Sequence, residues 1–125
     1  MIELTTKQGR INIKLNAVRM GKDLCVTITG GTCPHLGAIA LGVVRQSLAD
    51  SQKLSVSISV LTMVGHKEDD VVRMVANMLS SRLGKNVIVS CGIHLDEISV
   101  GEISIISNLV EQLTEKLINT INSNL

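Results

Sequence analysis

Apolar and polar side chains alternate along several segments of the chain, which is the pattern of strands with one buried face. The first alternation runs over residues 10–19, and after a turn at residues 20–22 a second one runs over residues 23–29. Two alternating segments joined by a short turn predict a β-hairpin. Residues 2–5 either begin this hairpin or form a short extra edge strand.

Three later segments are also interpreted as strands. Residues 54–64 alternate most clearly, with one apolar side and one side rich in serine, as in an antiparallel strand with a dry and a polar face. Residues 86–93 contain a β-branched run. Residues 36–44 are apolar and small. Periodicity alone does not separate strand from helix there, and we favour a strand.

Two segments carry apolar side chains at helical spacing. Residues 67–83 have acids in the first turn, where the helix macrodipole favours them, and Gly84 as a C-terminal stop. The second helix begins with a capping box, in which Ser99 accepts from the N–H of Glu102 and Glu102 reaches back. The apolar stripes are Val71, Val75, Met78, Leu79 and Leu83 in the first helix, and Ile103, Ile106, Val110, Leu113, Leu117 and Ile121 in the second.

The order of these elements predicts a two-layer α+β domain. Two helices, each about 10 Å wide, cover about four strands spaced about 4.8 Å apart. We therefore expect a mainly antiparallel sheet of about five strands with two helices on one face, in a single domain over residues 1–125. The other face, rich in Ser, Thr and Asn, suits water or a moderately polar protein interface.

The composition narrows the classes of partner. The chain is 45% hydrophobic but contains no Phe, Tyr or Trp, so it lacks the stacking platform of single-strand nucleic-acid binders. Its formal charge is +1, and it contains no run of like charge. We therefore expect no nucleic-acid partner. Because neither a signal-peptide core nor a membrane-spanning stretch is present, we expect a cytoplasmic protein. The three cysteines lack a CxxC spacing, which favours reduced thiols.

Candidate chemistry concentrates in three loops that each carry one histidine at or just after a predicted strand. The strings are GGTCPHLG, MVGHKEDD and CGIHLDEIS, with His35, His66 and His94. If the strands emerge at one end of the sheet, these loops converge. Gly30 and Gly31 free the backbone to turn its N–H groups towards an anion, while Pro34 stiffens the same loop.

Several kinds of site remain open at these loops. The Gly65-His66 step stands at a helix start, where free N–H groups attract phosphate or carboxylate, although the acids at residues 68–70 oppose this. Three imidazoles can also form a zinc site with an open water position. Cys33 is a candidate nucleophile if His35 lies within hydrogen-bond reach. Taken singly, each residue more often only shapes a turn or a helix end.

Taken together, the motifs resemble a known family. The strings GGTCPHLGAIAL, VGHKEDDVVRMVANML and VSCGIHLDEISVGEI look like the prenylated-flavin chaperone-like family, which includes the small accessory protein of gallate-type hydroxybenzoate decarboxylases. The resemblance runs from about Arg10 to Leu113, and the joint occurrence of the three motifs is far more specific than any one of them. The family fold is similar to that of the proteasome assembly chaperones, which pair their domains as dimers.

The resemblance implies a non-enzymatic homodimer that helps a flavin-dependent decarboxylase to acquire or keep prenylated flavin mononucleotide (FMN). The ligand would be prenylated FMN or FMN itself. Without aromatic residues, its ring can stack only on aliphatic, peptide or Arg surfaces. The cofactor-binding residues that the motifs imply are Gly30, Gly31, Pro34, His35, Gly65, His66, Lys67, His94 and Asp96.

Two other functions compete with this one. The first is a small enzyme in which the histidines perform acid-base or metal chemistry near neutral pH. The second is a protein-interaction adaptor or assembly chaperone without a cofactor, whose serine-rich sheet face binds a partner.

Overall fold

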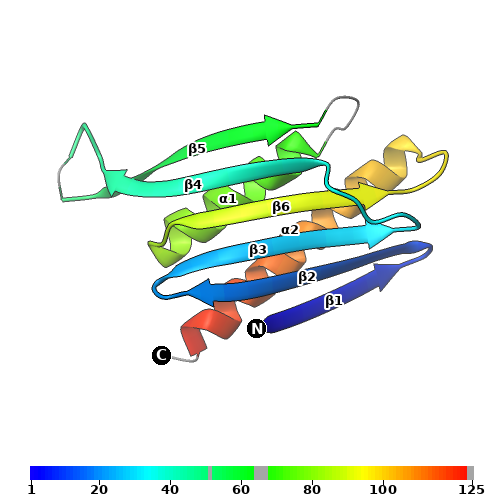
Figure 1. Ribbon diagram of the computed structural model, residues 1–125, viewed down its shortest axis with the longest axis horizontal. Helices are drawn as coiled ribbons and strands as arrows, with labels where there is room; N and C mark the ends of the chain where they lie inside the picture. The colour runs from blue at the N-terminus through cyan, green and yellow to red at the C-terminus, as the bar shows by residue number, and fades with distance from the viewer. Residues whose placement is uncertain (51, 64–67, 124–125) are drawn as a thin grey trace.

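A single six-stranded sheet with two helices on one of its faces makes up the protein (Figure 1). The structure, a computed structural model, describes residues 1–50, 52–63 and 68–123. The elements are β1 (Ile2–Gln8), β2 (Ile11–Met20), β3 (Asp23–Gly31), β4 (Ala38–Gln46), β5 (Leu54–Thr62), α1 (Asp69–Leu83), β6 (Val87–His94) and α2 (Val100–Ser123). The predicted two-layer α+β class is confirmed. The sixth strand is β1, which pairs antiparallel with β2 along its full length.

The strand order is β1-β2-β3-β6-β4-β5, so the last strand in the chain lies in the middle of the sheet. β6 runs parallel to β3 and antiparallel to β4, and the other neighbouring pairs are antiparallel. The C-terminal ends of β3 and β6 therefore lie side by side, and the start of β4 lies opposite the end of β6, with Ala38 paired to Cys91. This order places the loop between β3 and β4 and the loop after β6 at one end of the sheet.

The core between sheet and helices consists of aliphatic side chains. Among its fully buried members are Leu15, Leu79, Val89, Leu113 and Leu117. Burial of each such side chain stabilises the fold by about 1.5–3 kcal/mol relative to exposure, so the core forms without the large area that aromatic residues supply.

α1 lies closest to β4, which presents small residues to it. A Cβ atom on Gly42 would meet the Ser80 hydroxyl at 2.7 Å and the Ala76 carbonyl oxygen at 3.1 Å. The buried positions of α1 accordingly include Val72, Ala76 and Ser80 beside the predicted Val75 and Leu79. The apolar stripe is thus wider than the sequence predicted, because small residues on both elements allow close approach.

The predicted C-terminal end of α1 and the predicted start of α2 are confirmed, whereas α1 begins at Asp69. Gly84 adopts the left-handed conformation at φ 64° and donates its N–H to the Ser80 carbonyl, as expected for a glycine C-cap. At the start of α2, the Ser99 N–H donates to Glu102 Oε1 at 3.2 Å, and the Glu102 N–H donates to Ser99 Oγ at 3.1 Å. These two reciprocal bonds are the predicted capping box.

The face of the sheet opposite the helices is uncovered by any described element. Its β1–β3 part carries the expected polar residues, such as Asn12, Lys14 and Thr27. Its β4 part is instead apolar, with Leu41 43% and Val43 38% exposed. β4 turns its alanines and Gly42 towards the helices, so its larger side chains point outwards.

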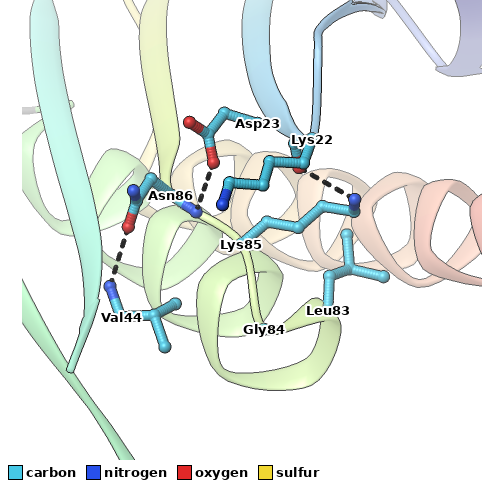
Figure 2. A pocket seen from close by; sticks show the side chains of 7 residues that line it. All are labelled: Lys22, Asp23, Val44, Leu83, Gly84, Lys85 and Asn86. Atoms are coloured by element: carbon cyan, nitrogen blue, oxygen red, sulfur yellow. Dashed lines mark hydrogen bonds between the residues drawn. The ribbon is translucent and has the colours of Figure 1, made fainter. Parts of the chain in front are cut away.

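At the end of the sheet away from the histidine loops, side chains join the turns (Figure 2). The Asn86 N–H donates to Asp23 Oδ1 at 3.3 Å, and the Val44 N–H donates to Asn86 Oδ1 at 3.0 Å. Lys85 Nζ donates to the Lys22 carbonyl at 2.9 Å. These bonds tie the β2–β3 turn and the end of β4 to the connection between α1 and β6, around a pocket of about 240 Å³.

The contact of Gly42 with α1 gives a stability prediction. Gly42→Val forces side-chain atoms against Ser80 and Ala76, and overpacking of this kind costs about 1–3 kcal/mol. We expect a lower midpoint in urea unfolding followed by circular dichroism. Val43→Ala, one residue along on the uncovered face, is the matched control and should change the free energy of unfolding by about 0.5 kcal/mol or less. Equal effects of the two variants would contradict the packing described here.

Candidate functional site

Two of the three histidine loops converge at one end of the sheet. The His35 and His94 ring centroids lie 6.2 Å apart, with an angle of 75° between the ring planes. The parallel pairing of β3 with β6 brings them together, because it places Gly31 opposite His94. The third loop, with Gly65, His66 and Lys67, lies outside the described residues.

Gly30 and Gly31 allow β3 to end in close contact with its neighbours. A side chain on Gly31, whose φ is 77°, would overlap the backbone of His94, and one on Gly30 would overlap the carbonyl oxygen of Asn12. The Thr32 N–H donates to the His94 carbonyl at 2.8 Å. The glycine pair therefore has a structural reason of its own, and a part in ligand binding stays a prediction. The same holds for Pro34, which is exposed in the loop that follows.

Glu68 belongs to this site but is not among the cofactor-binding residues that the motifs implied. Its Oε1 lies 3.2 Å from His35 Nε2 and accepts the Ile93 N–H at 3.4 Å. A Cβ atom on Gly37 would meet the Glu68 carboxyl carbon at 2.6 Å, so glycine makes room for this carboxylate. The side chain of Glu68 is 11% exposed. Two features of the sequence could have indicated Glu68: it follows the Gly65-His66 step closely, and Gly37 lies just after His35.

The partners of His35 define its orientation. Its Nδ1 lies 3.1 Å from the Cys33 carbonyl oxygen, and its Nε2 faces Glu68. Both ring nitrogens thus meet oxygen acceptors, and both can donate only if the imidazole carries two protons. The contact with Cys33 involves the carbonyl oxygen and not the thiol, so this geometry gives no support to Cys33 as a nucleophile activated by His35.

Glu68 also differs from the sequence expectation for the helix start. It stands at the N-cap position of α1 but makes no side-chain capping bond. The expectation that this acid satisfies the N–H groups of the helix end is wrong, because its carboxylate turns towards His35 and β6 instead. Asp69 and Asp70 occupy the first turn, where the macrodipole favours them.

A second polar network fixes the loop after β6. His94 Nε2 lies 3.1 Å from Asp96 Oδ1, and Arg10 Nη2 donates to the Asp96 carbonyl at 2.8 Å. Arg10 also binds both carboxylate oxygens of Glu102, at 2.7 and 2.8 Å. The hydrogen bond from Arg10, aided by the Ser99 N–H, lowers the pKa of Glu102 to about 2. Arg10 thereby connects the β1–β2 turn with the start of α2.

Beside the two histidines lies a groove of about 650 Å³ between the N-terminal ends of α1 and α2. Its apolar wall consists of Val71, Ile93, Leu95, Ile98, Ile103 and Ile106, and its polar residues are Glu68, Asp70, His94 and Ser107. Ile98 and Ile103 are 40% and 50% exposed, and both line this groove. The groove falls in the size range of small-molecule sites.

The groove fits one part of a flavin better than the other. Its wall is aliphatic, which suits an uncharged ring or a prenyl group. The charged residues that line its described part, Glu68 and Asp70, are both acids, and acids repel a phosphate. The fit is therefore to the apolar portion of such a ligand and not to its phosphate.

The three cysteines occupy different environments. Cys91 is buried, and burial together with the nearby Glu68 raises the pKa of its thiol to about 12. Cys33 is exposed in the first histidine loop, and Cys25 is half-buried on the uncovered face. Cys91 is thus a packing residue of the core.

Among the described residues, no group of three or more His, Cys, Asp and Glu side chains is arranged to hold a metal ion. Neither described helix is both long and apolar enough to cross a membrane.

Comparisons with known proteins confirm the family resemblance. A family model described as the prenylated flavin chaperone LpdD-like domain matches residues 7–122. Protein LpdD of Lactiplantibacillus plantarum is 22% identical over 119 residues, which cover 95% of this chain and 84% of that protein. A chain in the crystal structure of a chaperone complex for yeast 20S proteasome assembly is similar, with a TM-score of 0.53 at 14% identity, over 98% of this chain and 94% of that one. This last likeness confirms the proteasome-assembly-chaperone-like fold.

The cysteine environments predict a selective thiol reaction. Because the thiolate is the reactive form, the buried Cys91 should react with a thiol reagent such as iodoacetamide only after unfolding, whereas the exposed Cys33 reacts in the native protein. Peptide mass spectrometry after brief labelling measures both. Cys33→Ser is the control that removes the native label at that site. Native labelling of Cys91 as fast as that of Cys33 would contradict the burial of Cys91.

The lowered pKa of Glu102 predicts a pH-dependent contribution to stability. A carboxyl with a depressed pKa stabilises the fold above its ordinary pKa, and this contribution is lost as the pH falls from 4.5 towards 2. Glu102→Gln should therefore lower the melting temperature near neutral pH, and the difference from the native protein should shrink over that range.

The matched variant for this test is the double substitution of Glu102→Gln with Arg10→Gln. It should melt at or slightly below the Glu102→Gln single variant, because it loses the same ion pair and also the bond from Arg10 to the Asp96 carbonyl. A difference that stays constant from neutral pH down to pH 2 would show that the Glu102 charge does not contribute.

Proposed function

The chain belongs to the family of prenylated flavin chaperone LpdD-like domains, and on that premise we propose that it is a non-enzymatic accessory protein for prenylated flavin. It acts in the cytoplasm as a homodimer, binds prenylated FMN or FMN, and helps a flavin-dependent decarboxylase to acquire or keep that cofactor. The observation that carries this proposal is the aliphatic groove beside His35 and His94.

The groove suits the ring portion of the ligand. A flavin ring in a protein without aromatic residues needs aliphatic surfaces on which to lie, and Ile93, Ile98 and Ile103 offer them. His94, at the rim and held by Asp96, supplies a polar contact with a set direction. When bound, the flavin supplies the redox and electrophilic chemistry, whereas this chain holds and shields it.

The remaining candidate residues have supporting parts in this proposal. His35, held by Glu68, lies against His94, which is the histidine that lines the groove. Gly30, Gly31 and Pro34 shape the loop that presents His35. We assign the phosphate to the loop of Gly65, His66 and Lys67, on the sequence argument that a helix start attracts anions.

The decarboxylase would contact the uncovered sheet face. Ile39, Leu41 and Val43 form an outward apolar row on β4, and Ser57 and Ser59 of the neighbouring β5 lie opposite Val43 and Leu41. An apolar centre with a polar surround is typical of protein interfaces.

Ligand binding tests the proposal. Prenylated FMN, or FMN as the simpler probe, should raise the melting temperature of the protein, since a ligand that binds only the native state stabilises it. Ile103→Ser removes apolar contact area in the groove and should weaken binding by about tenfold, corresponding to about 1.4 kcal/mol. Isothermal titration calorimetry provides the dissociation constants.

The matched control is Val100→Ser, which lies on the same helix, is 83% exposed and does not line the groove. It should bind as the native protein does. No melting shift with either flavin would rule out direct cofactor handling and favour an adaptor without a cofactor. Equal losses in both variants would place the ligand elsewhere.

A further inference from the structure

β5 is an edge strand without the features that normally protect an edge. It pairs with β4 on one side, and in Figure 1 it forms the upper border of the sheet. An exposed edge presents unpaired N–H and C=O groups, and proteins usually block such edges with charged residues, proline or bulges. The sequence of β5, LSVSISVLT, contains none of the charged residues and no proline. The opposite edge strand, β1, carries Glu3 and Lys7.

The side chains of β5 are also incompletely buried. Leu54 and Leu61, near its two ends, are 64% and 74% exposed. Val56, Ile58 and Val60 face the helix side but are only half-buried, although Ile58 and Val60 pack on the core. A further strand along this edge would complete the burial of these three residues.

The sequence of β5 is close to a palindrome about Ile58. Ser57 and Ser59 flank the centre, followed by Val56 and Val60. If two copies of β5 pair antiparallel with Ile58 on a two-fold axis, each Ser57 lies opposite a Ser59 and each Val56 opposite a Val60 of the other copy. A two-fold interface requires that one surface complement itself, and β-branched and hydroxyl pairs stabilise antiparallel strands.

We infer that two copies of this chain associate through their β5 edges, antiparallel about Ile58, to form one continuous sheet. This identifies the surface by which the proposed homodimer forms. It leaves the uncovered sheet face of each copy accessible, and it needs no ligand.

A single lysine tests the edge. Ser59→Lys places a charge opposite Ser57 of the other copy, whose hydroxyl accepts from Arg45 Nε at 2.8 Å. Like charges that meet across paired strands are destabilising. Sedimentation equilibrium should give twice the monomer mass for the native protein and the monomer mass for Ser59→Lys. Ser104→Lys adds the same charge at an exposed position of α2 and should remain dimeric.

A cross-linking experiment tests the register. In a Cys25→Ser/Cys33→Ser background, Ser57→Cys and Ser59→Cys are prepared as separate proteins and mixed under mild oxidation. Directly opposed residues lie about 5 Å apart, within disulfide range, whereas diagonal ones lie about 7–8 Å apart. Disulfide dimers should therefore form in the mixture and far less in either protein alone.

Each outcome decides the proposal. A monomeric native protein contradicts both the homodimer and the edge pairing, although flavin binding by that monomer would leave the cofactor function standing. A dimer that survives Ser59→Lys but dissociates on Leu41→Glu assigns the interface to the uncovered sheet face and overturns the edge pairing alone. Cross-links of equal yield in the mixed and separate samples overturn the register.

Discussion

The parallel pairing of β3 with β6 is the interaction on which the rest of the structure depends. β6 follows β4, β5 and α1 along the chain, yet it lies in the sheet between β3 and β4. With neighbours on both sides and helices over one face, Val87, Val89 and Cys91 are all buried. Because β6 runs parallel to β3, the loops that follow the two strands emerge together. The contact between His35 and His94 is a consequence of this pairing.

The Glu68 carboxylate joins the site to the fold. It contacts a histidine from the first loop and a backbone N–H of β6 while standing at the start of α1. Gly37 leaves the space that this carboxylate occupies. A largely buried carboxylate is costly unless it has close partners, so these contacts hold three separate elements in one arrangement. Glu68 also lines the groove beside these contacts, so the same carboxylate belongs to the groove and to the packing of the three elements.

Small residues at the contact between α1 and β4 determine which side chains β4 presents on each of its faces. α1 approaches β4 closely because Ala76 and Ser80 meet Gly42, and the bulk of β4 is consequently on its outer face at Leu41 and Val43. This apolar outer row differs from the polar outer face of the β1–β3 part, from which β6 separates it. In the proposed function, the lack of aromatic residues restricts the flavin ring to aliphatic, peptide or Arg surfaces, of which the isoleucines of the groove are the aliphatic ones.

The sequence by itself determined the features that arise from neighbouring residues. The alternation of residues 10–29 predicted the hairpin of β2 and β3, Ser99 with Glu102 predicted the capping box, and Gly84 predicted the end of α1. These features depend on periodicity or on hydrogen bonds a few residues long, which a sequence displays directly. The three histidine motifs also indicated the family, although their spacing did not establish that the loops meet.

Only the tertiary structure decided which distant residues meet. Arg10 and Glu102 are 92 positions apart, and the Glu68 carboxylate turned to His35 instead of capping its own helix. The edge position of β5 and the apolar outer row of β4 likewise follow from strand order. Strand order is set by which apolar surfaces pack together in three dimensions, and a periodic pattern records only which face of a strand is apolar, not which strand lies beside it.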